Sequence, residues 1–351
     1  MISCAYAGIQ KMRQRLYRSH LFVTKQLPCK VISIGNITVG GTGKTPMTIA
    51  LAQRLDRLGL KVVVVSRGYR GAVEKAGGLV SNGRQVLLTP GQAGDEPFMM
   101  ACRLRPIPVV IGRDRAAAGA LAAKKFQPDV IILDDAFQHL QLARDIDLVL
   151  LDCASPFGNS HLLPRGSLRE PVSALSRADA FILTRSNRLA GATASAALAR
   201  LRAALPNRPI FTSSHHPYGY IVKHTVRLPF HEASRHLSPS EFQVLRGHKV
   251  FVFSGIARND DFQRTVTELG FKAVGFCQFS DHHLYSSQDF SAILQGARDS
   301  GAEFLITTEK DHARIAGHID GPLDLIVIGV KIDFGDDENR FNEFIEEKLA
   351  N

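Results

Sequence analysis

The strongest chemical signal in the sequence is a glycine-rich segment that ends in a lysine and a threonine. It reads Gly35-Asn-Ile-Thr-Val-Gly-Gly-Thr-Gly-Lys-Thr45, and it lies between an apolar run and a segment of helical character. Glycines let backbone N–H groups turn toward phosphate oxygens, and the N-terminus of the following helix adds positive potential. In such a loop Lys44 reaches the β- and γ-phosphates of a nucleotide, and Thr45 offers its hydroxyl to Mg²⁺. The segment therefore predicts a phosphate-binding loop (P-loop) for ATP and Mg²⁺.

Eight consecutive residues are predicted to surround the phosphates, and one departs from the strict pattern. They are Thr38, Val39, Gly40, Gly41, Thr42, Gly43, Lys44 and Thr45. The strict pattern has glycine at position 38, where this chain has threonine, although Gly40 and Gly41 keep the loop flexible. The alternative is a glycine turn without a ligand, which the flanking strand and helix disfavour.

A second signal is the acidic pair Asp134 and Asp135, which follows the apolar run 130–133. A carboxylate at such a strand end can hold Mg²⁺ opposite Thr45, so both residues are predicted to take part in metal chemistry. Each could instead cap the following turn. His139 comes soon after, and it could contact phosphate or make only structural hydrogen bonds.

Short apolar runs that alternate with helical patterns must position these residues. Strands are expected at 31–34, 62–65, 108–111, 130–133, 146–151 and 181–183. Helices are expected at 46–58 and 113–126. Continuous apolar strands between helices indicate an α/β fold of the P-loop NTPase type, a mostly parallel sheet with helices on both faces.

The pattern changes after Pro206, and a hinge is expected there. Alternating residues at 220–228 indicate strand pairs, and α/β alternation then resumes. We therefore predict a P-loop kinase domain over 1–207 and a smaller α/β domain over 208–351. A final helix at 339–349 could pack back on the first domain, and the boundary at 207/208 would then not separate the two domains completely.

Charge and composition limit where the protein acts. The formal net charge is +10, yet no acidic residue precedes Asp56. The first helical segment has an apolar stripe of Ile2, Tyr6, Ile9, Met12 and Leu16 that is bordered by cations. This pattern is typical of a helix on anionic lipid and equally of a surface helix docked on the core. No apolar run is long enough to span a membrane, and the scattered cysteines indicate neither disulfides nor zinc.

Seven segments together resemble the tetraacyldisaccharide 4′-kinases (LpxK) of lipid A biosynthesis. They are Ser33-Ile-Gly-Asn-Ile-Thr-Val-Gly-Gly-Thr-Gly-Lys-Thr-Pro46, Ser66-Arg-Gly-Tyr-Arg70, Gly94-Asp-Glu-Pro97, Leu133-Asp-Asp-Ala-Phe-Gln-His139, Leu163-Pro-Arg-Gly-Ser-Leu-Arg-Glu-Pro171, Phe279-Ser-Asp-His-His283 and Thr307-Thr-Glu-Lys-Asp311. They cover nearly the whole chain in the family's order. Ala136 stands where glycine is expected, which puts no role in doubt.

The resemblance implies transfer of the ATP γ-phosphate to the 4′-hydroxyl of a tetraacyldisaccharide 1-phosphate, giving lipid IVA. It also implies a peripheral enzyme on the cytoplasmic face of a bacterial inner membrane, which favours lipid contact by the N-terminal helix. We expect a monomer that binds no nucleic acid.

Catalytic roles are predicted for four residues. Lys44 belongs to the P-loop. From its local pattern alone Asp95 would cap a helix, but the resemblance makes it the base that accepts the hydroxyl proton, with His282 of the second domain as its partner. His283 is the alternative partner. Arg113 is predicted to neutralise charge on the transferred phosphoryl group, a role that Arg115 could also fill.

Substrate and additional metal contacts are predicted in two loops. Arg67, Tyr69 and Arg70 follow a strand at the edge where such sheets bind ligands, and Tyr69 could stack on sugar. The resemblance places Arg169 and Glu170 near the nucleotide, with Glu170 as a further Mg²⁺ residue. The segment 308–311 matches the family but has no assigned chemistry.

Two other classes of protein compete with the kinase. One is a P-loop switch or metallochaperone ATPase, against which the absence of an Asn-Lys-x-Asp motif argues mildly. The other is a nucleic-acid-binding ATPase, which only the basic charge suggests. Labelling of the lipid by γ-labelled ATP would separate the kinase from both.

Overall fold

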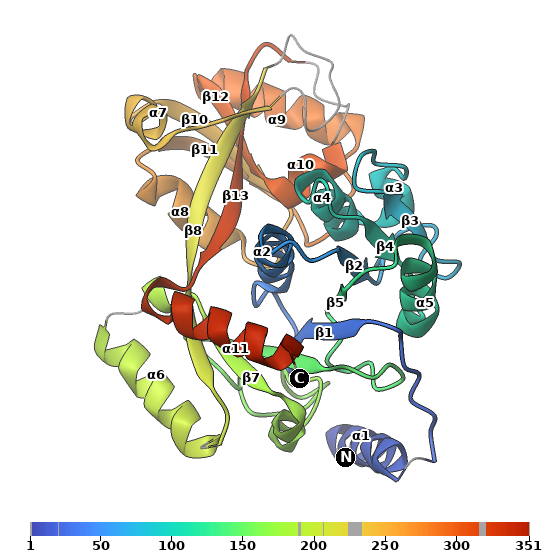
Figure 1. Cartoon of the computed structure of the whole chain (residues 1–351). Coiled ribbons are helices and arrows are strands. Elements are labelled where there is room, and N and C mark those ends of the chain that lie inside the picture. Colours follow the sequence, from blue (N-terminus) through green and yellow to red (C-terminus); the bar gives the residue numbers. More distant parts are fainter. Residues whose placement is uncertain are drawn as a thin grey trace. The chain divides into compact units, whose positions relative to one another are not determined.

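Two compact units make up the chain in the computed structural model, which describes residues 2–19, 21–188, 191–205, 207–223, 234–315 and 321–350. The first unit comprises Met1–His216 and Ile332–Asn351, and the second comprises Pro217–Lys331. The chain passes between them within two long strands, β8 (Ile210–Val222) and β13 (Leu325–Asp333). Figure 1 shows both units, with most of their elements labelled.

The sheet of the first unit is parallel except at one edge. Its strands are β1 (Lys30–Gly35), β2 (Val62–Ser66), β3 (Gly78–Ser81), β4 (Val109–Ile111), β5 (Val130–Asp134), β6 (Ile146–Asp152), β7 (Ala180–Thr184) and the first part of β8. Their order is β8-β7-β6-β1-β5-β2-β4-β3, and only β3 runs antiparallel. In the register of the central pair, Ile34 of β1 lies beside Asp134 of β5. The ends of β1 and β5 therefore meet at one edge of the sheet, which is where a P-loop fold binds its ligand.

Helices and short helical turns cover this sheet. They are α1 (Ile2–Arg18), α2 (Lys44–Arg57), α3 (Pro90–Ala93), α4 (Asp95–Arg103), α5 (Arg115–Phe126), η1 (Val172–Arg177), η2 (Ser186–Arg188), α6 (Gly191–Ala204), η3 (Gly335–Asp337) and α11 (Glu338–Ala350). The alanine-rich face of α5 packs against valine and isoleucine side chains of β1, β2, β4 and β5. The last helix, α11, is red in Figure 1 and packs Phe341 against Phe211 of β8, with ring centroids 5.2 Å apart.

The second unit has its own parallel sheet, in the order β11-β10-β12-β13. Its remaining strands are β9 (Ser234–His236), β10 (Lys249–Ser254), β11 (Lys272–Gln278) and β12 (Phe304–Thr308). Its helices are α7 (Pro239–Val244), α8 (Asn259–Glu268), α9 (Ser287–Asp299) and α10 (Glu309–Ile315). The short strand β9 pairs antiparallel with the end of β8. Apolar clusters that include Phe251 and Val252 fill the space between this sheet and its helices.

The predicted α/β class with a mostly parallel sheet is confirmed, with two local differences. The sequence did not predict β3, an edge strand of only four residues. The helix expected from residue 113 begins at Arg115, because the Asp114 carboxylate accepts hydrogen bonds from the N–H groups of Ala116 and Ala117 at 2.9 and 3.0 Å. Of the alternating segment 220–228, β8 includes the residues up to Val222, and 224–228 lie outside the described residues.

Candidate active site

The P-loop joins β1 to α2 in a conformation that needs glycine. Gly40 and Gly43 have φ values of 103° and 89°, in the left-handed region that other residues rarely adopt. Inside the loop, the Asn36 side-chain amide donates a 2.9 Å hydrogen bond to the hydroxyl of Thr42. A side chain on Gly40 or Gly41 would meet no heavy atom within 4 Å, so this part of the loop borders open space. The loop is therefore internally braced and open on its glycine side.

Two residues at the end of β7 hold the P-loop from outside. The Thr184 hydroxyl donates to the backbone oxygen of Thr42 at 3.1 Å, and the Arg185 guanidinium donates to the backbone oxygen of Gly41. Arg185 also forms an ion pair with the buried Asp152 at the end of β6. Sequence reasoning missed this clamp. The sequence did hold a signal for it, because polar residues follow the apolar runs 146–151 and 181–183, as Asp134 follows the run 130–133.

Asp134 is enclosed by the protein. Only 2% of it is exposed, and its carboxylate accepts hydrogen bonds from the hydroxyls of Thr48 (3.0 Å) and Ser66 (3.1 Å). Burial, together with the nearby charges of Glu96 and Asp135, raises the pKa of Asp134 to about 6. The carboxylate is thus held in a place where its negative charge is poorly stabilised unless a cation comes near.

Asp135 lies beside two cations. The Lys44 ammonium lies 3.6 Å from its carboxylate, and Arg169 donates to both carboxylate oxygens at 2.9 and 3.0 Å. Although burial opposes the charge, Lys44 and Arg169 hold the pKa of Asp135 below its ordinary value. The two adjacent aspartates therefore have opposite electrostatic environments.

Arg169 reaches Asp135 because its segment pairs with the P-loop. The N–H of Val39 donates to the oxygen of Ser167 at 2.8 Å, and the N–H of Arg169 donates to the oxygen of Ile37 at 2.7 Å. This short ladder joins residues far apart in the sequence. It places Arg169, which the resemblance put near the nucleotide, across the acidic pair; the ion pair with Asp135 itself was not predicted.

The donor set at the end of β5 fits Mg²⁺. Thr45 is buried at the start of α2, and its hydroxyl and the carboxylates of Asp134 and Asp135 are hard oxygen donors of the kind that Mg²⁺ prefers. Within the described part of the chain, no group of three or more His, Cys, Asp or Glu side chains could hold a metal on its own. A two-carboxylate site matches the usual Mg²⁺ arrangement, in which the ion is shared with substrate phosphates and water.

The contacts of Glu170 differ from those expected of the Mg²⁺ ligand that it was predicted to be. It is 1% exposed, and its carboxylate accepts from the Arg177 guanidinium at 2.8 Å. The side-chain amides of Gln138 and Gln14 donate to it at 3.1 and 3.0 Å. These contacts join α1 to the loop that carries Arg169.

Of the two arginines at the start of α5, Arg115 is the one beside the acidic pair. Arg113 is exposed, whereas Arg115 is 2% exposed and donates to the backbone oxygens of Gly112 (2.8 Å) and Asp134 (3.5 Å). Burial lowers the pKa of Arg115 to about 10, so it remains a cation at neutral pH. Nearby, burial and the charge of Arg115 lower the pKa of His139 to about 4, which leaves its imidazole neutral.

The loop with the predicted substrate residues packs against the start of α4. A side chain at Gly71 would come within 2.4 Å of the oxygen of Gln92, and one at Gly94 within 2.6 Å of the oxygen of Tyr69. This close approach brings the predicted base, Asp95, next to the substrate loop. Asp95 is half-buried and is the first residue of α4; the N-cap position belongs to Gly94 instead. The capping role considered for Asp95 therefore does not match the structure.

The substrate loop presents an aromatic ring between two cations. The guanidinium carbons of Arg67 and Arg70 lie 5.3 and 5.6 Å from the centre of the Tyr69 ring. Tyr69 is 48% exposed, and Arg67 is held by Glu74 at 2.7 Å. Such a surface suits a ligand with both a sugar face and a phosphate.

The two candidate histidines of the second unit differ in their surroundings. His283 stacks on Phe279 with centroids 4.5 Å apart and lies 3.1 Å from the carboxylate of Asp289. His282 has a left-handed backbone, with φ of 61°, and lies 3.9 Å from Asp281. The stacking and the Asp289 contact explain His283 as a structural residue, which leaves His282 as the better candidate for chemistry.

The N-terminal helix α1 docks on the first unit and leaves part of its apolar surface exposed. The Tyr6 hydroxyl donates to the oxygen of Arg169 at 2.8 Å, and Arg13 donates to the oxygen of Gln138 at 2.9 Å. Ile9 and Met12 remain 58% and 59% exposed. The helix therefore shows the feature expected of each sequence-based interpretation: it docks on the first unit, and it keeps apolar side chains exposed. The side chain of Ile2 lies outside the described residues. Among the described helices, none combines the length and apolar character that crossing a membrane requires.

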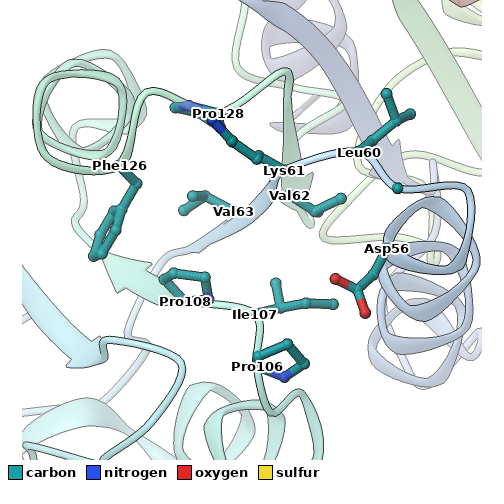
Figure 2. Close-up of a pocket in the computed structure, with 11 residues that line it drawn as sticks. Asp56, Leu60, Lys61, Val62, Val63, Pro106, Ile107, Pro108, Phe126 and Pro128 are labelled. Carbon is teal, nitrogen blue, oxygen red and sulfur yellow. The ribbon is translucent and has the colours of Figure 1, made fainter.

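A hollow of about 340 Å³ lies elsewhere in the first unit (Figure 2), lined by Asp56, Gly59, Leu60, Lys61, Val62, Val63, Pro106, Ile107, Pro108, Phe126 and Pro128. It borders the amino-terminal ends of β2 and β4, whereas the P-loop follows the carboxyl end of β1. None of its lining residues was predicted to act in binding or catalysis, so it is not the candidate active site.

Comparisons with known proteins agree over almost the whole chain. The family model of tetraacyldisaccharide-1-P 4′-kinase (LpxK) matches residues 1–350. A tetraacyldisaccharide 4′-kinase of Desulfatibacillum aliphaticivorans is 41% identical over 350 residues, 99% of this chain and 91% of the relative. One of Anaeromyxobacter sp. (strain Fw109-5) is 43% identical over 304 residues, 87% of this chain and 78% of the relative. The crystal structure of LpxK from Aquifex aeolicus in complex with ATP superposes with a TM-score of 0.76 at 30% identity, covering 99% of this chain and 97% of that one.

The match is full-length and specific to one activity, so it argues against the switch ATPase and the nucleic-acid-binding ATPase. It confirms the family indicated by the seven sequence segments, and with it the expected 4′-kinase activity in lipid A biosynthesis. The chain belongs to the tetraacyldisaccharide-1-P 4′-kinase (LpxK) family.

Proposed function

We propose that this kinase transfers the γ-phosphate of ATP to the 4′-hydroxyl of tetraacyldisaccharide 1-phosphate by direct attack, with the roles given below. The observation that carries the proposal is the contact of Lys44 with Asp135 at 3.6 Å, beside Arg169 and at the end of the P-loop. ATP in the Aquifex aeolicus structure supports ATP as the phosphoryl donor.

The P-loop holds the phosphates of ATP. Its backbone from Thr38 to Thr45 surrounds them, and Lys44 exchanges its contact with Asp135 for the β- and γ-phosphates. Thr45, Asp134 and Asp135 would hold Mg²⁺, which neutralises phosphate charge when it is bound. Glu170 is not included in this set, because Arg177 and two amides already engage its carboxylate. Arg115 takes the charge-neutralising role predicted for Arg113, because it is the buried arginine beside Asp134.

Asp95 accepts the proton of the attacking hydroxyl. It is half-buried at the start of α4, and it adjoins the loop of Arg67, Tyr69 and Arg70. Those three residues bind the phosphorylated sugar. His282 belongs to the other unit and orients Asp95 in the reacting complex, so catalysis requires the predicted P-loop kinase and smaller α/β domains to act together.

The roles of Asp95 and His282 are tested by measuring label transfer from γ-labelled ATP to tetraacyldisaccharide 1-phosphate. Asp95→Asn and His282→Ala should each lower kcat by roughly a hundredfold or more, as expected for loss of general-base catalysis. His283→Ala is the matched control, and its KM and melting temperature are measured beside those of His282→Ala. If the His283 variant loses as much kcat at equal stability, the assignment of His282 is wrong.

The metal assignment has its own test. Asp134→Asn and Asp135→Asn should each raise the Mg²⁺ concentration needed for half-maximal activity, because each removes one oxygen ligand. Glu170→Gln should leave that requirement unchanged. An unchanged requirement in both aspartate variants would contradict the proposed site.

We further propose that the enzyme is a monomer that binds the cytoplasmic face of the inner membrane through α1. The exposed side chains of Ile9 and Met12 would enter the lipid interface, and the exposed cations Lys11 and Arg15 would meet anionic headgroups. Lys11→Glu/Arg15→Glu should weaken binding to anionic vesicles in sedimentation. A variant that reverses two exposed lysines of α5, Lys124→Glu/Lys125→Glu, changes the net charge equally and should bind like the parent. Equal loss in both variants would show a general charge effect.

A further inference from the structure

A buried ion pair in the second unit joins Asp311, the last residue of the segment 308–311 to which no chemistry has been assigned, to Arg314. Asp311 and Arg314 are one helical turn apart on α10, and their side chains are 0% and 1% exposed. The guanidinium lies 2.8 Å from the carboxylate. A buried ion pair adds little stability compared with apolar residues of similar size, so its presence calls for another explanation.

The pair holds both polar groups of one backbone residue, Gly255, which follows β10. The N–H of Gly255 donates to the Asp311 carboxylate at 3.0 Å. The same nitrogen of Arg314 that meets Asp311 donates to the Gly255 oxygen at 2.7 Å. Two further donors keep the carboxylate in place, the hydroxyls of Thr308 at 2.6 Å and Tyr285 at 2.9 Å. The backbone of Gly255 is therefore held at both of its hydrogen-bonding groups.

Gly255 in turn contacts the segment that carries His282. Its oxygen accepts a 3.2 Å hydrogen bond from the N–H of His282. A side chain at position 255 would come within 3.0 Å of the oxygen of Ser280 and 3.2 Å of the Cβ of His283, so the two segments lie in close backbone contact. His282 has the left-handed φ of 61°, a backbone state that its surroundings must maintain.

A second link holds the same two segments together. The Asn259 side-chain amide donates to the oxygen of Phe279 at 3.0 Å. Its oxygen accepts from the hydroxyl of Ser254 at 2.6 Å and the N–H of Ile256 at 3.3 Å. Asn259 holds the start of the histidine segment, and the Gly255 contact reaches the backbone of His282 itself.

We propose that Asp311 and Arg314 are positioning residues that set the orientation of His282 through the backbone of Gly255. The inference rests on the proposed function, in which His282 orients the base Asp95. It gives the Thr-Thr-Glu-Lys-Asp segment a role in the reaction without contact with either substrate.

Two conservative variants test the proposal while keeping the buried charges paired. Tyr285→Phe removes one hydrogen bond to Asp311, and Gly255→Ala pushes on the histidine segment. Each should lower kcat by roughly tenfold or more while the KM for ATP changes little, since a small misplacement of a catalytic group slows only the chemical step. Val266→Ala truncates a buried side chain of α8 and is the control for lost stability, with kcat expected to stay as in the parent.

The decisive measurement is a double-mutant cycle with His282→Ala. If Asp311 acts through His282, Gly255→Ala and Tyr285→Phe should cause no further loss of kcat once His282 is absent. Losses that multiply in the double variants would overturn the positioning role and leave a purely structural one. Full activity of His282→Ala alone is a different result, because it would refute the proposed role of His282 and the inference with it.

Discussion

Replacing Asp134 by asparagine should stabilise the enzyme in the absence of nucleotide and Mg²⁺. Asp134 is 2% exposed, and its pKa is raised from 3.8 to about 6. That difference corresponds to on the order of 3 kcal/mol by which folding disfavours the ionised carboxylate. Asparagine carries no charge and can still bond the hydroxyls of Thr48 and Ser66. The variant should therefore gain stability, at most of this order, wherever the parent carboxylate is ionised.

The gain has a defined pH dependence. A carboxyl group whose folded pKa is raised contributes its full stability below about 3.8 and loses it as the pH rises through about 6. Asp134→Asn should thus be more stable than the parent at about pH 8, and this gain in the free energy of unfolding should shrink toward about pH 4.5. At about 2 to 4 °C per kcal/mol for a unit of this size, the melting temperature at the higher pH should rise by up to roughly 6 to 12 °C.

The neighbouring aspartate provides the matched control, with the opposite sign. Lys44 and Arg169 hold the pKa of Asp135 below its ordinary value, so its contribution is present above that value and lost as the pH falls. Asp135→Asn should be less stable than the parent at about pH 8, by under about 1 kcal/mol, because 31% of the side chain is exposed and solvent screens the pair.

Thermal and urea unfolding of the parent and both variants, with EDTA and without nucleotide, measures these differences at the two pH values. A lower stability of Asp134→Asn at the higher pH would refute the electrostatic reasoning, as would a gain that persists unchanged at the lower one. Asp134→Asn should be poorly active despite its stability, because the carboxylate that destabilises the empty site is one that would hold Mg²⁺ during catalysis.

Three further substitutions have effects that follow from single contacts. Gly43→Ala should lower the melting temperature by the equivalent of at least about 1 kcal/mol, because φ at this residue is 89° and the new Cβ would lie 2.7 Å from the His215 ring. Gly41→Ala, which has open space around it, is the control, and equal melting temperatures of the two variants would contradict this reasoning. Glu170→Gln should cost about 3 kcal/mol in urea unfolding, because it leaves the guanidinium of Arg177, only 12% exposed, without its carboxylate. A neutral result would show that the pair is not formed. Phe341→Ala should cost about 3 to 5 kcal/mol in the same assay because α11 loses its buried anchor on β8, whereas a cost under about 1 kcal/mol would mean that α11 is not docked.

Local patterns in the sequence were sufficient for much of the site. The P-loop lies between a strand and a helix that each follow from a short stretch of sequence, and the glycines at 40 and 43 have the positive φ that explains their residue type. Asp134 and Asp135 end an apolar strand, which predicted their place at the ligand-binding edge. The sequence was sufficient to predict these features because strand, turn and helix propensities act over neighbouring residues.

Contacts between distant segments could not be read in this way. Nothing near Asp135 in the sequence indicates that Arg169 forms its ion pair, because that contact depends on the pairing of Ser167 with Val39 across the P-loop. The same holds for Arg185, which reaches Gly41 because β7 lies next to β6 and β6 lies next to β1 in the sheet. Strand order is a property of the whole fold, so these partners appear only when the sheet is assembled.

The sequence by itself determined the family, the P-loop and the acidic strand end, because each is a run of adjacent residues with its own chemistry. Only the tertiary structure decided between neighbours of similar type. Arg115 is buried beside Asp134 while Arg113 is exposed, because Asp114 caps α5 and turns the next residue inward. His283 stacks on Phe279, whereas His282 has a left-handed backbone with φ of 61°. Adjacent residues share their sequence context, and only packing against distant segments separates their roles.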